Sequence, residues 1–353
     1  MKALIAMSGG VDSSVAAYLT LKEGLDCIGG TAQMCDRAIL ADAYSEQGIE
    51  DASAVAQRLG MEFHVFDAVD AFKSAVVENF ITCYEQGLTP NPCVVCNRHI
   101  KFSYLLDKAL ELGCDYIVTG HYAQVKQDEN TGRYLLYKAA DEAKDQSYFL
   151  ACLDQYQLAH IQFPLGRFTK AEIREIAESQ GFLTAKKKDS QDICFVPDGD
   201  FMGFICRYTG KNYPEGPFLD MQGKPVGKHS GAIRYTLGQR KGLGLAMGEP
   251  VYVCSKDMDR NTVTVGPEEA LYTQTLIAND WNWFPFPALT EPMQVMAKAR
   301  SRHIPQPATV YPMESGQAKV VFDMPQRAVT PGQTVVLYQD DLVVGGGTIT
   351  ETY

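Results

Sequence analysis

The feature that most constrains this chain is a glycine-rich loop between an apolar run and a helix-forming stretch. Residues 2–7 predict a short buried strand, and residues 11–23 carry apolar side chains at helical spacing. Between them the sequence at 8–14 reads SGGVDSS. Backbone N–H groups at such a helix start point at an anion and share the positive end of the helix dipole. The sequence therefore predicts a phosphate-binding loop.

This loop lacks the lysine of the commonest phosphate-binding motif. A Walker A loop reads G-x-x-x-x-G-K-[ST], so the missing lysine argues against ordinary transfer of a terminal phosphate. The hydroxyls of Ser8, Ser13 and Ser14 add donors, and the loop suits a pyrophosphate group. The alternative interpretation is a strand–helix turn in which glycines give tightness and the Ser and Asp side chains cap the helix.

The first part of the chain alternates between predicted strands and helices. After the loop we expect further strands at residues 27–31, 62–68 and 115–119, and helices at residues 49–59, 71–84 and 97–112. The order β-α-β-α favours a parallel sheet covered by helices on both faces. The fold class is therefore α/β with a doubly wound parallel sheet.

The second part of the chain is predicted to be all β. From about residue 217 helical periodicity ends, Gly and Pro separate short runs, and strands are expected at residues 251–254, 261–265, 318–322 and 334–338. A chain of 353 residues exceeds one hydrophobic core. We expect an α/β domain at 1–205, a small β-rich domain at 206–275 and a β-barrel domain at 276–353.

Composition limits the cell compartment and the class of partner. No run approaches the roughly 20 apolar residues of a membrane span, and residues 1–7 are too short for a signal peptide, so we expect a cytoplasmic protein without a membrane partner. Ten Cys in that compartment are expected to be reduced thiols with catalytic or metal chemistry at some positions. The formal net charge of −11 argues against a generic nucleic-acid binder but does not exclude a local basic surface.

The motifs together resemble a known family. The string SGGVDS resembles the SGGxDS signature of PP-loop ATP pyrophosphatases, which adenylylate an oxygen and release pyrophosphate. The whole chain is similar to the tRNA-specific 2-thiouridylases, whose strings it carries at residues 89–97, 119–122, 144–149, 185–190 with 193–195, 236–244 and 330–333. The resemblance implies a sheet of the adenine nucleotide alpha hydrolase type followed by two small β domains.

The resemblance also implies an activity and its ligands. ATP, with Mg²⁺, would adenylylate the C2 oxygen of the wobble uridine in tRNA. The ATP-binding residues that it implies are Ala6, Met7, Ser8, Gly9, Gly10, Val11, Asp12, Ser13, Ala32 and Gly120. The tRNA-binding residues that it implies are Asn91, Pro92, Cys93, His121, Lys144, Asp145, Gln146, Arg300, Ser301 and Gln333. For His121 the other interpretation is a capped or buried histidine at a strand end.

Two thiols are the candidate catalytic residues. By resemblance Cys194 carries a persulfide and Cys96 resolves it as a disulfide; a reductant and an upstream sulfur donor, either a cysteine desulfurase or a sulfur-relay protein, regenerate the site. A thiolate attacks best near cations or a helix start, and we expect Cys96 to precede directly a helix that begins at Asn97 and carries Arg98 and Lys101.

Cys93 opens an alternative chemistry. Many family members have Asp at this position, so a role of residue 93 as a base is in doubt. Relatives often carry Met in place of Ala32, so packing of this side chain against the adenine is also in doubt. Cys93, Cys96 and Cys194 are compatible with an iron–sulfur cluster, [4Fe-4S] with one open iron. Zinc is disfavoured because no second C-x-x-C pair follows. Cys35 is undecided, and six other thiols are interpreted as small apolar residues: Cys27, Cys83, Cys114, Cys152, Cys206 and Cys254.

Three short basic clusters are candidate RNA contacts or solvated faces. They lie at residues 186–188, at Arg234 with Arg240 and Lys241, and at residues 298–303. In the last cluster, alternation predicts a strand with Lys298, Arg300 and Arg302 on one face. The competing functions are a PP-loop ligase that transfers nitrogen and a non-catalytic tRNA-binding or iron–sulfur module.

Overall fold

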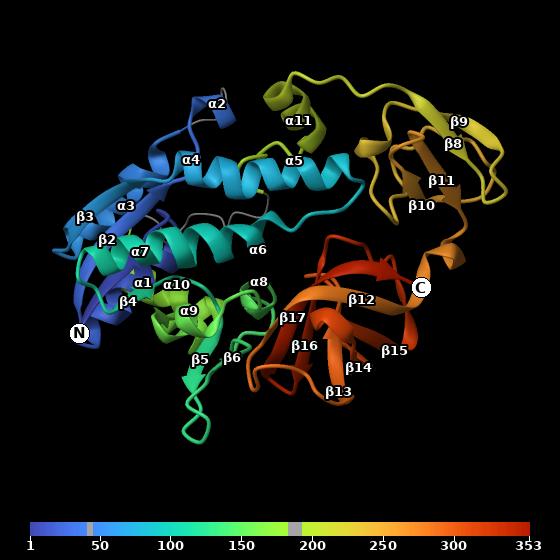
Figure 1. Ribbon diagram of the computed structural model, residues 1–353. Coiled ribbons are helices and arrows are strands. Elements are labelled where there is room, and N and C mark those ends of the chain that lie inside the picture. The colour runs from blue at the N-terminus through green and yellow to red at the C-terminus, as the bar shows by residue number, and fades with distance from the viewer. Residues whose placement is uncertain (41–44, 183–192) are drawn as a thin grey trace.

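The protein, seen here as a computed structural model, is described over residues 1–40, 45–182 and 193–353. A parallel α/β unit forms its N-terminal part, and two β units follow (Figure 1). From α11 (Phe201–Thr209) the chain runs through an extended stretch into the smaller β unit, and then returns to a barrel beside the α/β unit (Figure 1).

The α/β unit is built on a five-stranded parallel sheet in the order β3-β2-β1-β4-β7. Its strands are β1 (Lys2–Ala6), β2 (Asp26–Gln33), β3 (Glu62–Asp67), β4 (Tyr116–Val118) and β7 (Ile161–Gln162). The first strand is central and the chain winds outward from it in both directions. This confirms the predicted doubly wound sheet.

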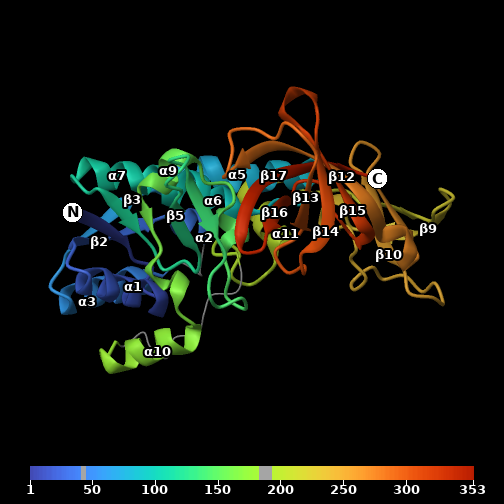
Figure 2. The same ribbon diagram turned by 90° about the horizontal axis from the view of Figure 1, so that it is seen from below.

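Helices cover both faces of this sheet. They are α1 (Val11–Lys22), α2 (Arg37–Leu40), α3 (Gln47–Arg58), α4 (Val69–Phe72), α5 (Glu78–Glu85), α6 (Pro92–Cys96), α7 (Leu105–Glu111), α8 (Ser147–Leu150), α9 (Gln155–Ala159) and α10 (Lys170–Ser179), with π-helical segments Lys73–Val77 and Asn97–Tyr104 and a 3-10 turn Pro164–Arg167. Figure 2 shows α1, α3 and α10 on one side of the sheet and α7 on the other. Successive side chains of β1 point to opposite faces of the sheet. Ala3 and Ile5 therefore join the core under α1, while Leu4 packs with Phe102 and Leu106 on the other face.

The helix predicted at residues 97–112 begins earlier, at Pro92. Proline suits a first helical position, and the side chain of Asn91 caps the helix by accepting a hydrogen bond from the backbone of Val94 at 3.4 Å. The helix continues without a break through its π-helical segment into α7. The expectation that Cys96 precedes a helix start is therefore wrong, and Cys93 is the thiol in the first turn.

The C-terminal unit is a barrel. Its strands follow the order β12-β15-β14-β13-β16-β17, and β12 also pairs with β17, which closes it. They are β12 (Tyr272–Trp283), β13 (Met293–Lys298), β14 (Gln306–Pro312), β15 (Ala318–Arg327), β16 (Thr334–Gln339) and β17 (Leu342–Thr352), with a 3-10 turn Glu314–Gly316. Strand β13 ends at Lys298, so the expectation that Arg300 and Arg302 continue this strand on one face is wrong. Arg300 turns back to bond Thr330 instead.

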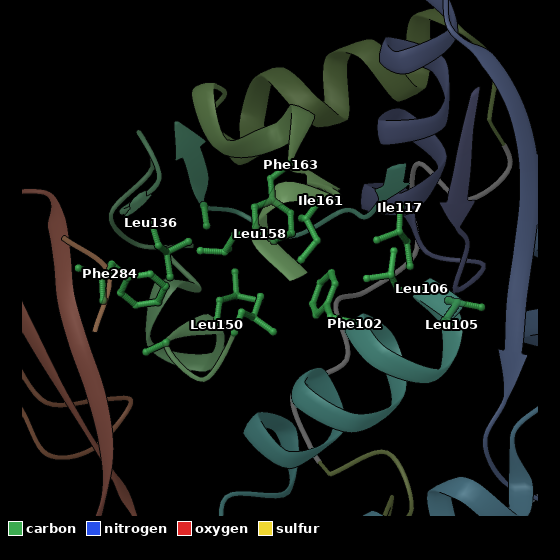
Figure 3. Close-up of a cluster of buried hydrophobic side chains, with 14 of the residues drawn as sticks. Phe102, Leu105, Leu106, Ile117, Leu136, Leu150, Leu158, Ile161, Phe163 and Phe284 are labelled. Carbon is green, nitrogen blue, oxygen red and sulfur yellow. The ribbon is translucent and has the colours of Figure 1, made fainter. Parts of the chain in front are cut away.

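A hairpin from the α/β unit extends the barrel sheet. It consists of β5 (Gln124–Gln127) and β6 (Tyr134–Tyr137), and Tyr137 pairs with Leu342 of β17. Phe284 of the barrel unit joins Leu136 and Leu150 in one buried cluster (Figure 3). The barrel and the α/β unit therefore share part of their hydrophobic core.

The smaller β unit is a four-stranded sheet in the order β10-β11-β8-β9. Its strands are β8 (Gly216–Leu219), β9 (Pro225–His229), β10 (Tyr252–Asp257) and β11 (Thr262–Gly266), with 3-10 turns Ala232–Arg234 and Glu268–Leu271. Phe218, Val253 and Val263 are fully buried at its centre. Together with the barrel, this sheet confirms that the second part of the chain is β.

Candidate active site

The predicted phosphate loop lies at the carboxyl end of β1 and is held by close backbone packing. Gly9 has φ +70°, and a Cβ atom there would lie 2.3 Å from the carbonyl oxygen of Gly48. On the other side a Cβ atom on Gly120 would lie 2.8 Å from backbone atoms of Asp12 and Ser13. Only glycine permits these approaches. The glycines therefore bring the loop between the start of α3 and the end of β4.

The start of α1 offers an anion site. Its cap is Gly10, with no side chain to bond the first N–H groups. The hydroxyls of Ser13 and Ser14 donate to the carbonyl of Gly10 at 3.1 and 2.9 Å, and the backbone N–H of Ser8 donates to the Ser13 hydroxyl at 3.2 Å. These bonds tie the loop to the first turn of α1.

Asp12 is the acidic residue of the loop, and two side chains from elsewhere hold it. Lys170 Nζ lies 2.8 Å from both carboxylate oxygens, and the hydroxyl of Tyr122 donates to Oδ1 at 2.7 Å. Sequence reasoning did not find either partner. Lys170 is the first residue of α10, after the capping residue Thr169, and this local signal marks a helix start without indicating its contact with the loop.

The remaining predicted ATP residues lie around the same loop. Ala6 ends β1, and Met7 is buried in the core under α1. The carbonyl of Met7 accepts a hydrogen bond from Thr31 at 2.6 Å, which ties the loop to β2. Ala32 also lies in β2, partly buried between two core clusters.

Three thiols gather around the end of α6. Cys96 is buried with its sulfur 3.8 Å from that of Met34, whereas Cys93 and Cys194 are exposed. Desolvation of the Cys194 sulfur by surrounding protein, together with the nearby Cys96 and Cys93, nevertheless raises the pKa of Cys194 to about 12. Burial likewise raises the pKa of Cys96. The thiols that the sequence singled out are therefore close neighbours, and protonated at neutral pH as they stand.

Lys101 is the cation that faces this thiol cluster. It opposes the rise in pKa of Cys93, Cys96 and Cys194. Its Nζ lies 3.5 Å from Nε2 of His121. Arg98, the other cation expected near the thiols, is paired with Asp280.

His121 is buried and neutral. The hydroxyl of Thr119 lies 2.7 Å from its Nδ1, and the rings of Phe102 and Phe163 pack beside it with centroids 5.6 and 5.9 Å away. Burial, and then the charge of Lys101, lower the pKa of His121 well below its usual value. Its imidazole therefore faces Lys101 as a hydrogen-bonding group.

Several predicted tRNA residues make intramolecular bonds that organise the segment before α6 and the turn before α8. Gln333 donates to the carbonyls of Thr89 and Pro90 at 2.9 and 3.1 Å, which ties the segment before α6 to the barrel. The side chain of Gln146 accepts a bond from the backbone of Tyr122 at 2.9 Å. A second group organises the turn before α8, since Asp145 accepts bonds from the backbones of Ala139 and Ser147.

Among the predicted cations only some lie open to solvent. Arg302, Arg240 and Lys241 are exposed, but Arg300 bonds Thr330 and the carbonyl of Leu237. The other tRNA candidates are mixed: Pro92 is buried in α6, while Lys144 and Ser301 are partly buried. The basic cluster at 186–188 lies outside the described residues.

Two kinds of feature are absent from the described ranges. Across residues 1–40, 45–182 and 193–353, no three Cys, His, Asp or Glu side chains stand close enough to hold a metal ion. Within those same ranges, no helix has both the length and the apolar character needed to cross a bilayer.

A doubly wound parallel sheet with an SGG loop at the start of α1 defines a PP-loop nucleotide-binding protein. Three family models match successive parts of the chain: a tRNA methyl transferase HUP domain matches residues 1–198, a tRNA methyl transferase PRC-barrel domain matches 202–267 and an aminomethyltransferase beta-barrel domain matches 273–349.

The chain belongs to the family of tRNA-specific 2-thiouridylases (MnmA). It is 47% identical to the Acetivibrio thermocellus member over 354 residues, with 99% of each chain covered. The Clostridioides difficile member is 45% identical over 352 residues, covering 99% of this chain and 98% of the relative. The Halothermothrix orenii member is 47% identical over 361 residues, covering 100% and 99%.

Two solved structures have a distant likeness to this chain. The U34-tRNA thiolase NcsA from Methanococcus maripaludis with its [4Fe-4S] cluster is 18% identical, with a TM-score of 0.36, over 60% of this chain and 71% of that one. A 4-thiouridine synthetase–RNA complex with bound ATP is 20% identical, with a TM-score of 0.36, over 56% and 45%. Nothing about the site of this chain follows from them.

Proposed function

We propose that this chain catalyses the ATP-dependent 2-thiolation of the wobble uridine of tRNA. The observation that carries the proposal is that one chain contains both a candidate phosphate-binding site and a cluster of thiols. An anion loop at the start of α1 suits a polyphosphate, and the three thiols beside Lys101 supply sulfur chemistry. A nitrogen-transferring ligase would need only the first site. The full-length relatives named 2-thiouridylases support the same conclusion.

The reaction has an activation step and a transfer step. The C2 oxygen of the uridine attacks the α-phosphorus of ATP, so that a new O–P bond forms as pyrophosphate leaves. The terminal sulfur of a Cys194 persulfide then attacks C2, and AMP leaves with the original oxygen. The thiolate of Cys96 attacks the inner sulfur of Cys194, which releases the thiocarbonyl and leaves a Cys96–Cys194 disulfide. An external reductant returns both thiols.

The phosphate loop is proposed to act in the activation step, and the three thiols with Lys101 in the transfer step. Backbone N–H groups around Gly10 and the Ser8 hydroxyl would hold the leaving pyrophosphate, while the Ser13 hydroxyl holds the loop through the Gly10 carbonyl. Mg²⁺ is proposed to arrive on the phosphates of ATP, where it neutralises charge. No ready protein cage for it is found in the described part of the chain. Lys101 would stabilise a thiolate once the substrate is bound.

The partner is proposed to be tRNA, with an upstream sulfur donor that loads Cys194. Exposed cations of the smaller β unit and the barrel, Arg240, Lys241 and Arg302, are available to phosphates. The target base must be splayed out to reach both ATP and a thiol. The ten cysteines are all free, which supports work in a reducing compartment such as the cytoplasm.

An iron–sulfur cluster on Cys93, Cys96 and Cys194 is the alternative sulfur carrier. Thiolates are the right donors for it. As these side chains stand they do not form a metal site, so no step is derived through a cluster. Iron and acid-labile sulfide analysis after anaerobic purification tests it: a stoichiometric cluster required for turnover would replace the persulfide route.

The experiment that tests the proposed function follows ATP products and the modified base together. Wild-type protein is incubated with ATP, Mg²⁺, a persulfide donor and unmodified tRNA, and then AMP, pyrophosphate and 2-thiouridine are quantified by chromatography and mass spectrometry. All three are expected to appear together. A tRNA already thiolated at the wobble base is the matched control and should release no AMP. ADP as the product, or AMP release without tRNA thiolation, would contradict the proposal.

A further inference from the structure

The phosphate loop carries an acidic side chain where a polyphosphate is to bind. Asp12 lies in the first turn of α1, next to the N–H groups that would hold the anion. A lone carboxylate there would repel phosphate, because like charges in a partly buried site interact strongly. The loop at 8–14 contains no Lys or Arg to offset this charge.

The offsetting charge comes from α10, far along the chain. Lys170 and Asp12 are 158 positions apart, yet Nζ lies 2.8 Å from each carboxylate oxygen. Lys170 is 9% exposed, and its Nζ also lies 5.8 Å from the centre of the Tyr122 ring. The Asp12 side chain is only partly buried, and removal of Lys170 leaves its carboxylate without this partner in the loop.

We propose that Lys170 makes the phosphate loop able to accept ATP by neutralising the charge of Asp12. The inference rests on the proposed function, because it takes ATP to be the ligand of this loop. Lys170 acts through Asp12 and is therefore a positioning residue. If the ion pair only tied α10 to α1, ATP affinity would not depend on the charge of Asp12.

The test measures equilibrium binding of ATP and of pyrophosphate by calorimetry in four proteins: wild type, Lys170→Gln, Asp12→Asn and the double variant. Lys170→Gln is expected to weaken ATP binding about tenfold or more, because it leaves Asp12 uncompensated. The double variant is expected to recover a large part of that loss, since it removes the repelling charge as well. Lys108→Met, which removes a surface cation that pairs with Glu111 and lies over the Tyr104 ring, is the matched control and should bind as wild type.

The outcomes separate the two proposals. If wild type binds neither ATP nor pyrophosphate, the proposed function fails. If wild type binds ATP and Lys170→Gln binds within about twofold, or the double variant is as weak as the single one, the inference about Lys170 is wrong. Thermal melts of all four proteins show whether they fold. If Lys170→Gln does not fold alone, the double variant still tests the inference against Asp12→Asn: similar binding by these two proteins would support it, and a further tenfold loss in the double variant would overturn it.

Discussion

At the scale of single residues, Cys93 separates the two sulfur chemistries. It stands in the first turn of α6, where burial raises the pKa of its thiol and Lys101 opposes the rise. The family resemblance drawn from the sequence implies Asp at this place in many relatives. A carboxylate near Lys101 can position a proton or the base, but it is a poor replacement for a cluster thiolate.

We therefore expect Cys93→Asp to keep much of the aerobic thiolation activity. In parallel, Cys96→Ser should abolish turnover while Cys194 can still be loaded with sulfur, because only the resolving thiol is lost. Mass spectrometry of the intact protein detects the loaded sulfur, and Cys254→Ser in the smaller β unit is the control. A Cys93→Asp enzyme that is inactive with and without air, beside a wild type that loses activity as it loses iron, would instead assign the three thiols to a cluster.

The residues of this site differ in how far they could be predicted. The loop glycines and the paired thiols could be predicted, because each belongs to a short sequence motif whose spacing has a physical reason. Lys170 and Tyr122 are not, because they meet Asp12 only after α10 and the end of β4 pack against the loop. Cys96 was placed wrongly because the capping by Asn91 and the proline at Pro92 were not recognised as a helix start.

At the scale of elements, the approach of the phosphate loop to α3 depends on the missing side chain of Gly9. Gly9→Ala adds the cost of a left-handed alanine, about 1–2 kcal/mol, and places Cβ 2.3 Å from the Gly48 carbonyl. The loop must then move, so ATP binding is expected to be lost. Gly60→Ala is a close control, because Gly60 has the same φ of +70° and open space around it. Calorimetry should show normal ATP binding in Gly60→Ala, and equal binding by both variants would contradict this account of the loop.

Strand β10 contains a buried charge that predicts a pH dependence of stability. Burial lowers the pKa of Lys256 to about 8, and its Nζ has no hydrogen-bond partner. Between pH 8 and 10.5 the unfolded chain holds a proton that the folded chain lacks, so the destabilisation is full below pH 8 and fades as pH rises to 10.5.

We expect Lys256→Met to raise the free energy of unfolding by up to about 3 kcal/mol at pH 7, and this gain should disappear near pH 10.5. Urea unfolding of both proteins at pH 7, 9 and 10 measures it. A constant difference across this range would show that the ammonium group is not the cause.

At the scale of the whole molecule, the β units are attached to the α/β unit by contacts that no local pattern indicates. The sequence predicted the parallel sheet and the β character of the second part, because both follow from periodicity and turn residues. The pairing of Tyr137 with Leu342 joins segments some two hundred residues apart, and Phe284 enters the core beside Leu136. Such pairings depend on the packing of complete surfaces.

These attachments change the expected role of the basic cluster after β13. Arg300 bonds Leu237 of the smaller β unit and Thr330 of the barrel unit, whereas Arg302 is exposed. Arg302→Ala is therefore expected to lower the salt slope of tRNA binding by about one, with unchanged thermal stability. Arg300→Ala should lower the melting temperature. Filter binding across a salt series tests the first expectation, and thermal melts test the second. An unchanged salt slope in Arg302→Ala would show that Arg302 does not contact tRNA phosphates.

The central claim is that ATP activates the C2 oxygen of uridine and that sulfur then replaces this oxygen. The most direct measurement uses tRNA carrying ¹⁸O at C2 of the wobble uridine and follows the label by mass spectrometry. The account predicts one ¹⁸O in the phosphate of each AMP released, with one 2-thiouridine formed per labelled AMP. Unlabelled AMP accompanied by 2-thiouridine would mean that the oxygen leaves by another route, and would contradict adenylylation of the base.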